Sequence, residues 1–243
     1  MIIKRVRKRF METMDTRKMF DEEIVITCRA LAQEEAIGNP LHDDYPIQRG
    51  RERMIEADFM GSKGQAFSDA WFNYRGTVGD ILALNLETNA RRAIFVCSLN
   101  AVMAGMGMIP PAVHCKDGDL TECADAFSRF AGRMFPRTDR FLLVGLQPRL
   151  LEKLTALKHV RVCDLNPENI GVPRCGIVVD GPERFAENAK WAETIIATGS
   201  SLVNGTIDEI LAAGRETYFY GVTITGAACR FDLRQYCFTT GNI

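Results

Sequence analysis

The sequence predicts an α/β protein with a Rossmann-like parallel sheet in its C-terminal part and an α+β unit in its N-terminal part. After Pro136, short apolar runs alternate strictly with helical segments, which is typical of βαβ crossovers. Before Pro136, helices and antiparallel strands are segregated instead. We therefore expect two domains, residues 1–136 and residues 137–243.

Composition and charge exclude several classes of protein. The chain has 243 residues, of which 47% are hydrophobic and 25% charged, with a formal net charge of -1. Its pI near 6.3 argues against a nucleic-acid-coating domain, for which a value above about 9 is typical. The sequence has no run of about 18 apolar residues and no apolar segment behind the charged N-terminus. We expect a cytoplasmic protein without nucleic-acid or membrane partners.

The eight cysteines are spread along the chain from Cys28 to Cys237. Small secreted scaffolds concentrate their cysteines, so this spacing favours reduced, buried thiols over a disulfide framework. The basic cluster between Lys4 and Arg9 is interpreted as a solvated helix face.

The N-terminal elements follow from hydrophobic periodicity. Residues 1–20 predict a basic helix, and residues 23–28 and 54–59 predict strands of a small antiparallel sheet. Between them, residues 38–50 form a long polar loop of the kind that often has a function. Further helices are expected at 77–86, 91–108 and 121–135, the last with Thr121 as N-cap.

The second domain is predicted to contain five strands, and the simplest parallel arrangement gives them the order 3-2-1-4-5. The strands are expected at 141–144, 160–163, 177–179, 194–197 and 217–220. The helices between them are expected at 148–157, 182–189 and 206–213.

The first two strands of this sheet end in residues suited to a ligand crevice. Gly145 ends the first strand, and Gln147 and Pro148 open the helix after it. Asp164, 19 residues beyond Gly145, stands where dinucleotide-binding folds place a carboxylate on ribose. The glycine-rich fingerprint is missing, however, because the chain reads Gly145-Leu-Gln-Pro-Arg-Leu. The alternative is that Asp164 only caps a turn.

The most specific local feature is the segment 197–206, a strand end followed by a turn rich in glycine and hydroxyl groups. Thr206 and Glu209 predict a capping box at the start of a helix, whose N–H groups suit a carboxylate, phosphate or ribose oxygen. The alternative is an architectural turn in which Gly199 has a positive φ. The candidate ligand contacts here and nearby are Asn169, Thr198, Gly199, Ser200, Ser201, Asn204, Gly205 and Thr206.

A third candidate site lies in residues 113–123. His114, Cys115 and Cys123 are residue types that bind zinc, copper or iron. Their spacing is not that of a zinc finger, and a structural turn with buried thiols is the alternative. Nucleophilic triads find little support, because the chain has three histidines and no nucleophile elbow.

Together these segments resemble a prokaryotic family labelled a putative heavy-metal chelation domain. The resemblance covers nearly the whole chain and implies an N-terminal domain similar to the enolase N-terminal fold, followed by a Rossmann-like domain. It implies no catalytic residues. The matching segments are Glu34-Glu-Ala-Ile-Gly-Asn-Pro40, Gly64-Gln-Ala-Phe67, Ser98-Leu-Asn-Ala-Val102, His114-Cys-Lys-Asp117 with Cys123, Asn169-Ile-Gly171 and Thr198-Gly-Ser-Ser-Leu-Val-Asn-Gly-Thr206.

Two functions compete. The leading hypothesis is binding of a small anionic ligand or a metal, with a transition metal as the candidate cofactor, in the crevice between the domains of a chain that can form a homodimer. The alternative is an enzyme of methyltransferase-like type that places Asp164 on the ribose of an adenosine-containing cofactor. The sequence leaves open whether any reaction is catalysed.

Overall fold

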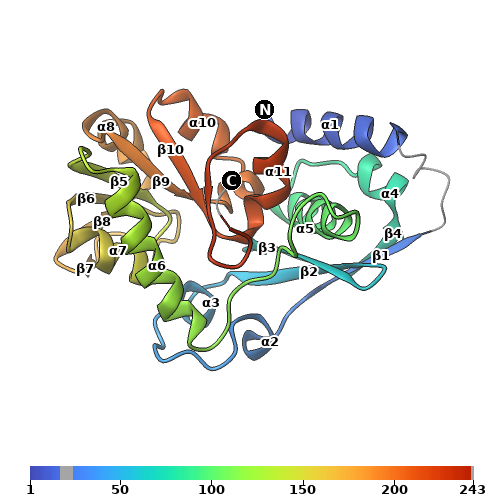
Figure 1. Ribbon diagram of the computed structural model, residues 1–243, viewed down its shortest axis with the longest axis horizontal. Helices are drawn as coiled ribbons and strands as arrows, with labels where there is room; N and C mark the ends of the chain where they lie inside the picture. Colours follow the sequence, from blue (N-terminus) through green and yellow to red (C-terminus); the bar gives the residue numbers. More distant parts are fainter. Residues whose placement is uncertain (17–23, 242–243) are drawn as a thin grey trace.

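A computed structural model describes residues 1–16 and 24–241 of the chain. It has a parallel sheet on the left of Figure 1 and an antiparallel sheet at the lower right. Helix α5 (Asn89–Gly105) lies on the antiparallel sheet, beside α1 (Ile2–Thr16) and α11 (Thr225–Phe231). The predicted combination of a C-terminal parallel sheet and an N-terminal α+β unit is confirmed.

The N-terminal sheet has four antiparallel strands in the order β3-β2-β1-β4. Met60 and Gly61 have φ values of 53° and 84°, as a two-residue hairpin turn between β2 and β3 requires. The sequence did not predict β3, because it is buried at adjacent positions and lacks alternation. The strands are β1 (Val25–Ala30), β2 (Arg53–Phe59), β3 (Ser62–Ser68) and β4 (Tyr74–Thr77). The helices around this sheet include α2 (Gln33–Ile37), α3 (Pro46–Arg49) and α4 (Val78–Ala83).

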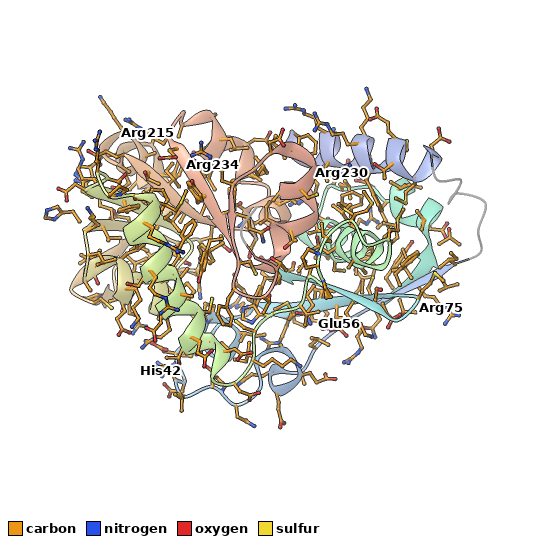
Figure 2. The ribbon with its side chains drawn as sticks, viewed as in Figure 1. His42, Glu56, Arg75, Arg215, Arg230 and Arg234 are labelled. Atoms are coloured by element: carbon orange, nitrogen blue, oxygen red, sulfur yellow. The ribbon has the colours of Figure 1, made fainter. Side chains whose placement is uncertain are left out.

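Helix α1 covers the far side of α5. Its residues Ile3, Val6 and Phe10 are buried at the helical spacing that the sequence predicts. Arg9 donates to the carbonyl oxygen of Arg230, which Figure 2 shows beside α1. Residues 17–20 of the predicted helix and Glu23 of the predicted first strand lie outside the described residues.

The C-terminal sheet has the order β11-β10-β9-β5-β6-β8-β7. Its five main strands confirm the predicted order 3-2-1-4-5, and the short strands β7 and β11 extend it at the two edges. Those main strands are β5 (Arg140–Val144), β6 (His159–Cys163), β8 (Ile177–Asp180), β9 (Thr194–Thr198) and β10 (Glu216–Tyr220), and the edge strands are β7 (Pro173–Arg174) and β11 (Gln235–Tyr236).

Helices cover both faces of this sheet. Alternate residues of β5 explain why, since Phe141 and Leu143 join one apolar cluster and Leu142 joins the other. Helices α6 and α7 pack on the first face, and α8 and α10 on the second. The helices are α6 (Asp119–Met134), α7 (Pro148–Thr155), α8 (Phe185–Trp191), α9 (Ser201–Asn204) and α10 (Ile207–Ala212), with short 3-10 turns η1 (Pro182–Arg184) and η2 (Val222–Ile224).

One predicted helix cap and one predicted capping box are wrong. Helix α6 begins after Gly118, so that Thr121 lies inside it. Thr206 stands at the N-cap of α10 as predicted, but it has helical backbone angles and donates its hydroxyl to Asn204. The capping box with Glu209 therefore does not form.

The predicted domain boundary at residue 136 stays a prediction. Helix α6 precedes it but packs against α7 on the parallel sheet. The largest apolar cluster includes residues of both sheets, among them Ile55 of β2 and Ile195 of β9. Within the described residues, none of the helices is both long and apolar enough to span a bilayer.

One buried amide joins the two units. The side-chain nitrogen of Asn100, in α5, donates to the carbonyl oxygens of Gln65, Val222 and Thr223 at 2.9–3.3 Å. Its side-chain oxygen accepts from the backbone N–H of Gly226 at 2.9 Å. Asn100 is fully buried, so these contacts fix β3 and the start of α11 on the same helix.

We expect Asn100→Leu to lower the free energy of unfolding by about 3–5 kcal/mol, because it leaves several buried backbone groups without a partner. Urea unfolding measures this. The matched control is Asn85→Leu, on an exposed residue with one local hydrogen bond, which should cost less than about 1 kcal/mol. Equal effects of the two substitutions would contradict the joining role of Asn100.

Candidate functional site

A cavity of about 140 Å³ lies at the carboxyl edge of the parallel sheet. Gly145, Asp164 and Thr198, which follow or end β5, β6 and β9, form one wall. Strand order reverses between β5 and β9, and open α/β sheets bind ligands at such a switch point. The crevice that the sequence predicted is therefore present.

The opposite wall comes from the N-terminal unit. Tyr45, Ile47 and Phe67 supply apolar surface, and His114 lies beside them. The predicted functional loop thus contributes to the cavity through its last residues. Asp117 holds the start of that loop, because its carboxylate accepts from the N–H of Asn39 at 2.7 Å.

A second cavity of about 90 Å³ adjoins the first. The two share Glu52, Gly145, Asp164, Asn166, Thr198 and Ser200. Asn204, Thr206 and Glu209 line the second cavity alone. Of the predicted contacts, Gln147 and Asn169 line the first cavity, whereas Gly199, Ser201 and Gly205 line neither.

The turn after β5 requires glycine. Gly145 has φ +84°, and a Cβ there would lie 2.7 Å from the Thr198 methyl and 3.0 Å from the Tyr220 hydroxyl. Tyr220 donates this hydroxyl to the carbonyl oxygen of Gly145 at 2.9 Å. Burial, with the nearby charge of Asp164, raises the pKa of Tyr220, so the phenol stays protonated.

Both carboxylate oxygens of Asp164 accept hydrogen bonds from the protein itself. One carboxylate oxygen accepts from the N–H of Leu146 at 2.5 Å, and the other accepts from the N–H of Asn166 at 2.7 Å and from the Asn169 amide at 3.3 Å. These bonds tie the β6 turn to the β5 turn. The geometry agrees with the turn-capping interpretation and gives no support to a ribose-binding role.

The 198–206 turn is likewise closed by its own groups. Asn204 accepts from the N–H and the hydroxyl of Thr206, and Gly205 ends α9 with φ +88°. Ser201 is fully buried, and its hydroxyl has no hydrogen-bond partner among the described residues.

Gly199 differs from both sequence interpretations. Its φ is not positive, and a Cβ there would lie 2.9 Å from the backbone nitrogen of Ile224 and 3.2 Å from the carbonyl oxygen of Tyr220. Gly199 is needed because the backbones of two neighbouring turns touch at this position.

Several backbone donors at the two turns already have partners. The N–H groups of Gly145 and Leu146 donate to Cys163 O and Asp164, and that of Leu150 donates to the Gln147 side chain. In the other turn, Gly199 donates to Tyr220 O and Ser200 to the Thr198 hydroxyl. These five N–H groups are therefore not available to an anionic ligand.

The side chains around the cavities are acidic. Glu52, Asp164 and Glu209 line them, and the described lining residues include no lysine or arginine. The charge of Arg149 acts on Tyr45 in the wall, but its guanidinium is already paired with Asp44 at 2.7 Å and Glu152 at 2.9 Å.

Glu52 is the residue that sequence reasoning missed. It stands just before β2, lines both cavities and is partly buried. Burial raises its pKa to about 7, with additional contributions from the charges of Asp164 and Asp69. A carboxyl group that titrates near neutral pH in a cavity is typical of functional sites. In the sequence it stands between Arg51 and Arg53, and such a charged segment favours a solvent-exposed position.

The predicted metal residues meet at the same cavity. His114, Cys115 and Cys123 all line it, together with Cys237. Interaction with the Cys115 thiol lowers the pKa of Cys123. His114 lies with Nδ1 2.7 Å from the carbonyl oxygen of Cys115, so Nδ1 must be the protonated nitrogen, and burial lowers its pKa.

These residues do not form a complete metal site. Among residues 1–16 and 24–241, no group of three or more His, Cys, Asp or Glu side chains is placed to hold one metal ion. Structural zinc sites use four ligands and catalytic sites three. The described residues therefore do not fit a metal ion bound by protein side chains alone.

Comparison with known proteins supports the resemblance seen in the sequence. The model of the DUF364 family, described as "Putative heavy-metal chelation", matches residues 133–231. The resemblance to this family is confirmed. No curated protein matches the chain.

Two solved structures of DUF364 proteins with unknown function share the fold over most of the chain. The protein from Pyrococcus horikoshii is 16% identical with a TM-score of 0.52, and covers 92% of this chain and 79% of that chain. The protein from Desulfitobacterium hafniense DCB-2 is 9% identical with a TM-score of 0.53. The match covers 93% of the present chain and 84% of the D. hafniense chain. At these identities the likeness shows the fold alone.

We expect Gly199→Ala to destabilise the protein by about 1–3 kcal/mol, because the added methyl group overlaps the backbone of Ile224. Gly132→Ala, on the exposed side of α6 with open space around it, is the control and should stabilise by about 0.5–1 kcal/mol. Thermal unfolding measures both. A neutral Gly199→Ala would show that the two turns do not need close contact.

The Glu52 carboxyl should make stability fall as pH rises. The folded protein holds this proton more tightly than the unfolded chain, whose pKa is near 4.5, so stability is lost between about pH 4.5 and 7. We expect Glu52→Gln to be more stable than wild type by about 1–3 kcal/mol near pH 8, and equally stable near pH 4.5. The exposed Glu168→Gln controls for the loss of one negative charge. Parallel pH profiles of Glu52→Gln and wild type would rule out the raised pKa.

Proposed function

We propose that the protein binds a small molecule with an apolar body and a cationic or hydrogen-bond-donating group, in the cavity between the two units. The observation that carries this proposal is the lining itself, in which carboxylates stand at the switch point without any lysine or arginine. Glu52 receives the donor group, and Tyr45, Phe67 and Leu146 contact the apolar body.

The size of the cavity supports a compact ligand. A volume of about 140 Å³ is close to that of buried cavities that accept benzene. Walls from two units also allow a ligand to stabilise their contact, which is why such interfaces are common binding sites.

Heavy-metal chelation is the description of the family. For this chain we propose it only with ligands from a bound molecule in addition to the protein thiols. The described residues offer two neighbouring thiols rather than a full set of ligands, so a metal ion would need further ligands from a bound molecule. The adenosine-cofactor alternative has no comparable support, because Asp164 is occupied by the β5 and β6 turns.

The proposal is tested with three probes that have one ring and different charges: benzylamine, benzyl alcohol and benzoate. Near pH 8, where Glu52 is ionised, we expect about 10 mM benzylamine to raise the melting temperature by roughly 3–5 °C, if it binds with a Kd of about 1 mM. Benzoate should give no shift.

Two further results sharpen this test. The benzylamine shift should disappear in Glu52→Gln and shrink near pH 6, where Glu52 is mostly protonated. Glu168→Gln should keep the shift, because this residue lies on an exposed turn. A benzoate shift as large as that of benzylamine would contradict the proposed ligand class.

A further inference from the structure

Cys115 and Cys123 form a thiol pair on the wall of the cavity. Cys115 lies in the segment before α6, and Cys123 lies in the second turn of α6. Both pack in one small apolar cluster with Ile37 and Leu120, and interaction between the two thiols raises the pKa of Cys115 and lowers that of Cys123. Both residues also line the cavity, so a molecule inside it contacts the two cysteines.

A second thiol pair offers an internal comparison. The sulfur atoms of Cys28 and Cys97 are 3.9 Å apart, but both residues lie in the main core and line neither cavity. The two thiols of each pair therefore interact, but only Cys115 and Cys123 line the cavity.

We propose that Cys115 and Cys123 are a dithiol site for trivalent organic arsenicals. Soft thiol ligands favour soft, thiol-seeking elements. An arsenic atom that already has one carbon substituent needs only two sulfur atoms, so it does not require the third protein ligand that the described residues lack. The organic substituent occupies the apolar part of the cavity, between Tyr45 and Leu146.

The reaction is a ligand exchange without oxidation. The two thiols react with R–As=O to give R–As(S–Cys)₂ and one water molecule, which receives both thiol protons. Two As–S bonds form, the As=O bond breaks, and arsenic stays trivalent. Binding through two sulfurs of one chain makes the second bond intramolecular and strengthens capture by a factor of about 100 or more over a single thiol.

The test uses phenylarsine oxide with the full-length chain, in the presence of the monothiol 2-mercaptoethanol, and native mass spectrometry. We expect one adduct per chain, with the mass of phenylarsine oxide less one water, that dithiothreitol removes. Cys115→Ser and Cys123→Ser should bind about 100-fold more weakly. Cys175→Ser removes an exposed thiol, Cys237→Ser removes the third thiol of the cavity wall, and both should keep the adduct.

Peptide mapping of the wild-type protein gives a result that does not depend on the folding of any variant. Phenylarsine oxide should protect Cys115 and Cys123, and no other cysteines, from iodoacetamide. Protection of Cys28 and Cys97, or no adduct on the wild-type chain, would overturn the proposal. The site shares its cavity with the proposed function, and the two fail separately: Glu52→Gln should lose the benzylamine shift and keep the adduct, and Cys115→Ser should do the reverse.

Discussion

The position of the cavity depends on one buried side chain, that of Asn100. Its amide nitrogen donates to Gln65 O on the N-terminal sheet and to Val222 O and Thr223 O in the turn after β10. Phe67, two residues beyond Gln65, and Thr223 both line the cavity, and the Phe67 N–H also donates to the Thr223 hydroxyl. A hydrogen-bonded network in a low-dielectric core specifies one arrangement, so the two walls keep a fixed separation. Asn100 also belongs to one of the segments that resemble the family.

The chemistry of the site depends on backbone N–H groups that already donate hydrogen bonds within the protein. Several N–H groups of both turns at the switch point donate to Asp164, to Thr198 and to backbone carbonyls. The lining combines carboxylates with apolar surface, and its described residues include no lysine or arginine. Burial makes the ionised form of Glu52 unfavourable, and a proton or a donor group on a ligand offsets this desolvation cost. Binding of the proposed cationic ligand should therefore release the Glu52 proton near neutral pH.

Much of the fold could be predicted from the sequence, because strict alternation of strands and helices leaves few parallel topologies. The same rule located Gly145, Asp164 and Thr198 at one edge, since parallel strands end together. The direction of the Gly199 Cβ and the charge of the ligand could not be predicted. Both depend on which backbone groups meet across turns that are far apart in sequence. Glu52 was missed because its burial and its neighbour Asp164, more than a hundred positions away, cannot be seen in the local sequence.

The most direct test of this account is a crystal structure of the protein soaked with benzylamine. The account predicts density in the cavity at the switch point, with the ammonium group within hydrogen-bond distance of the Glu52 carboxylate and the ring between Tyr45 and Leu146. Benzylamine bound only at another surface, with the cavity free of it, would contradict the assignment of this cavity as the ligand site.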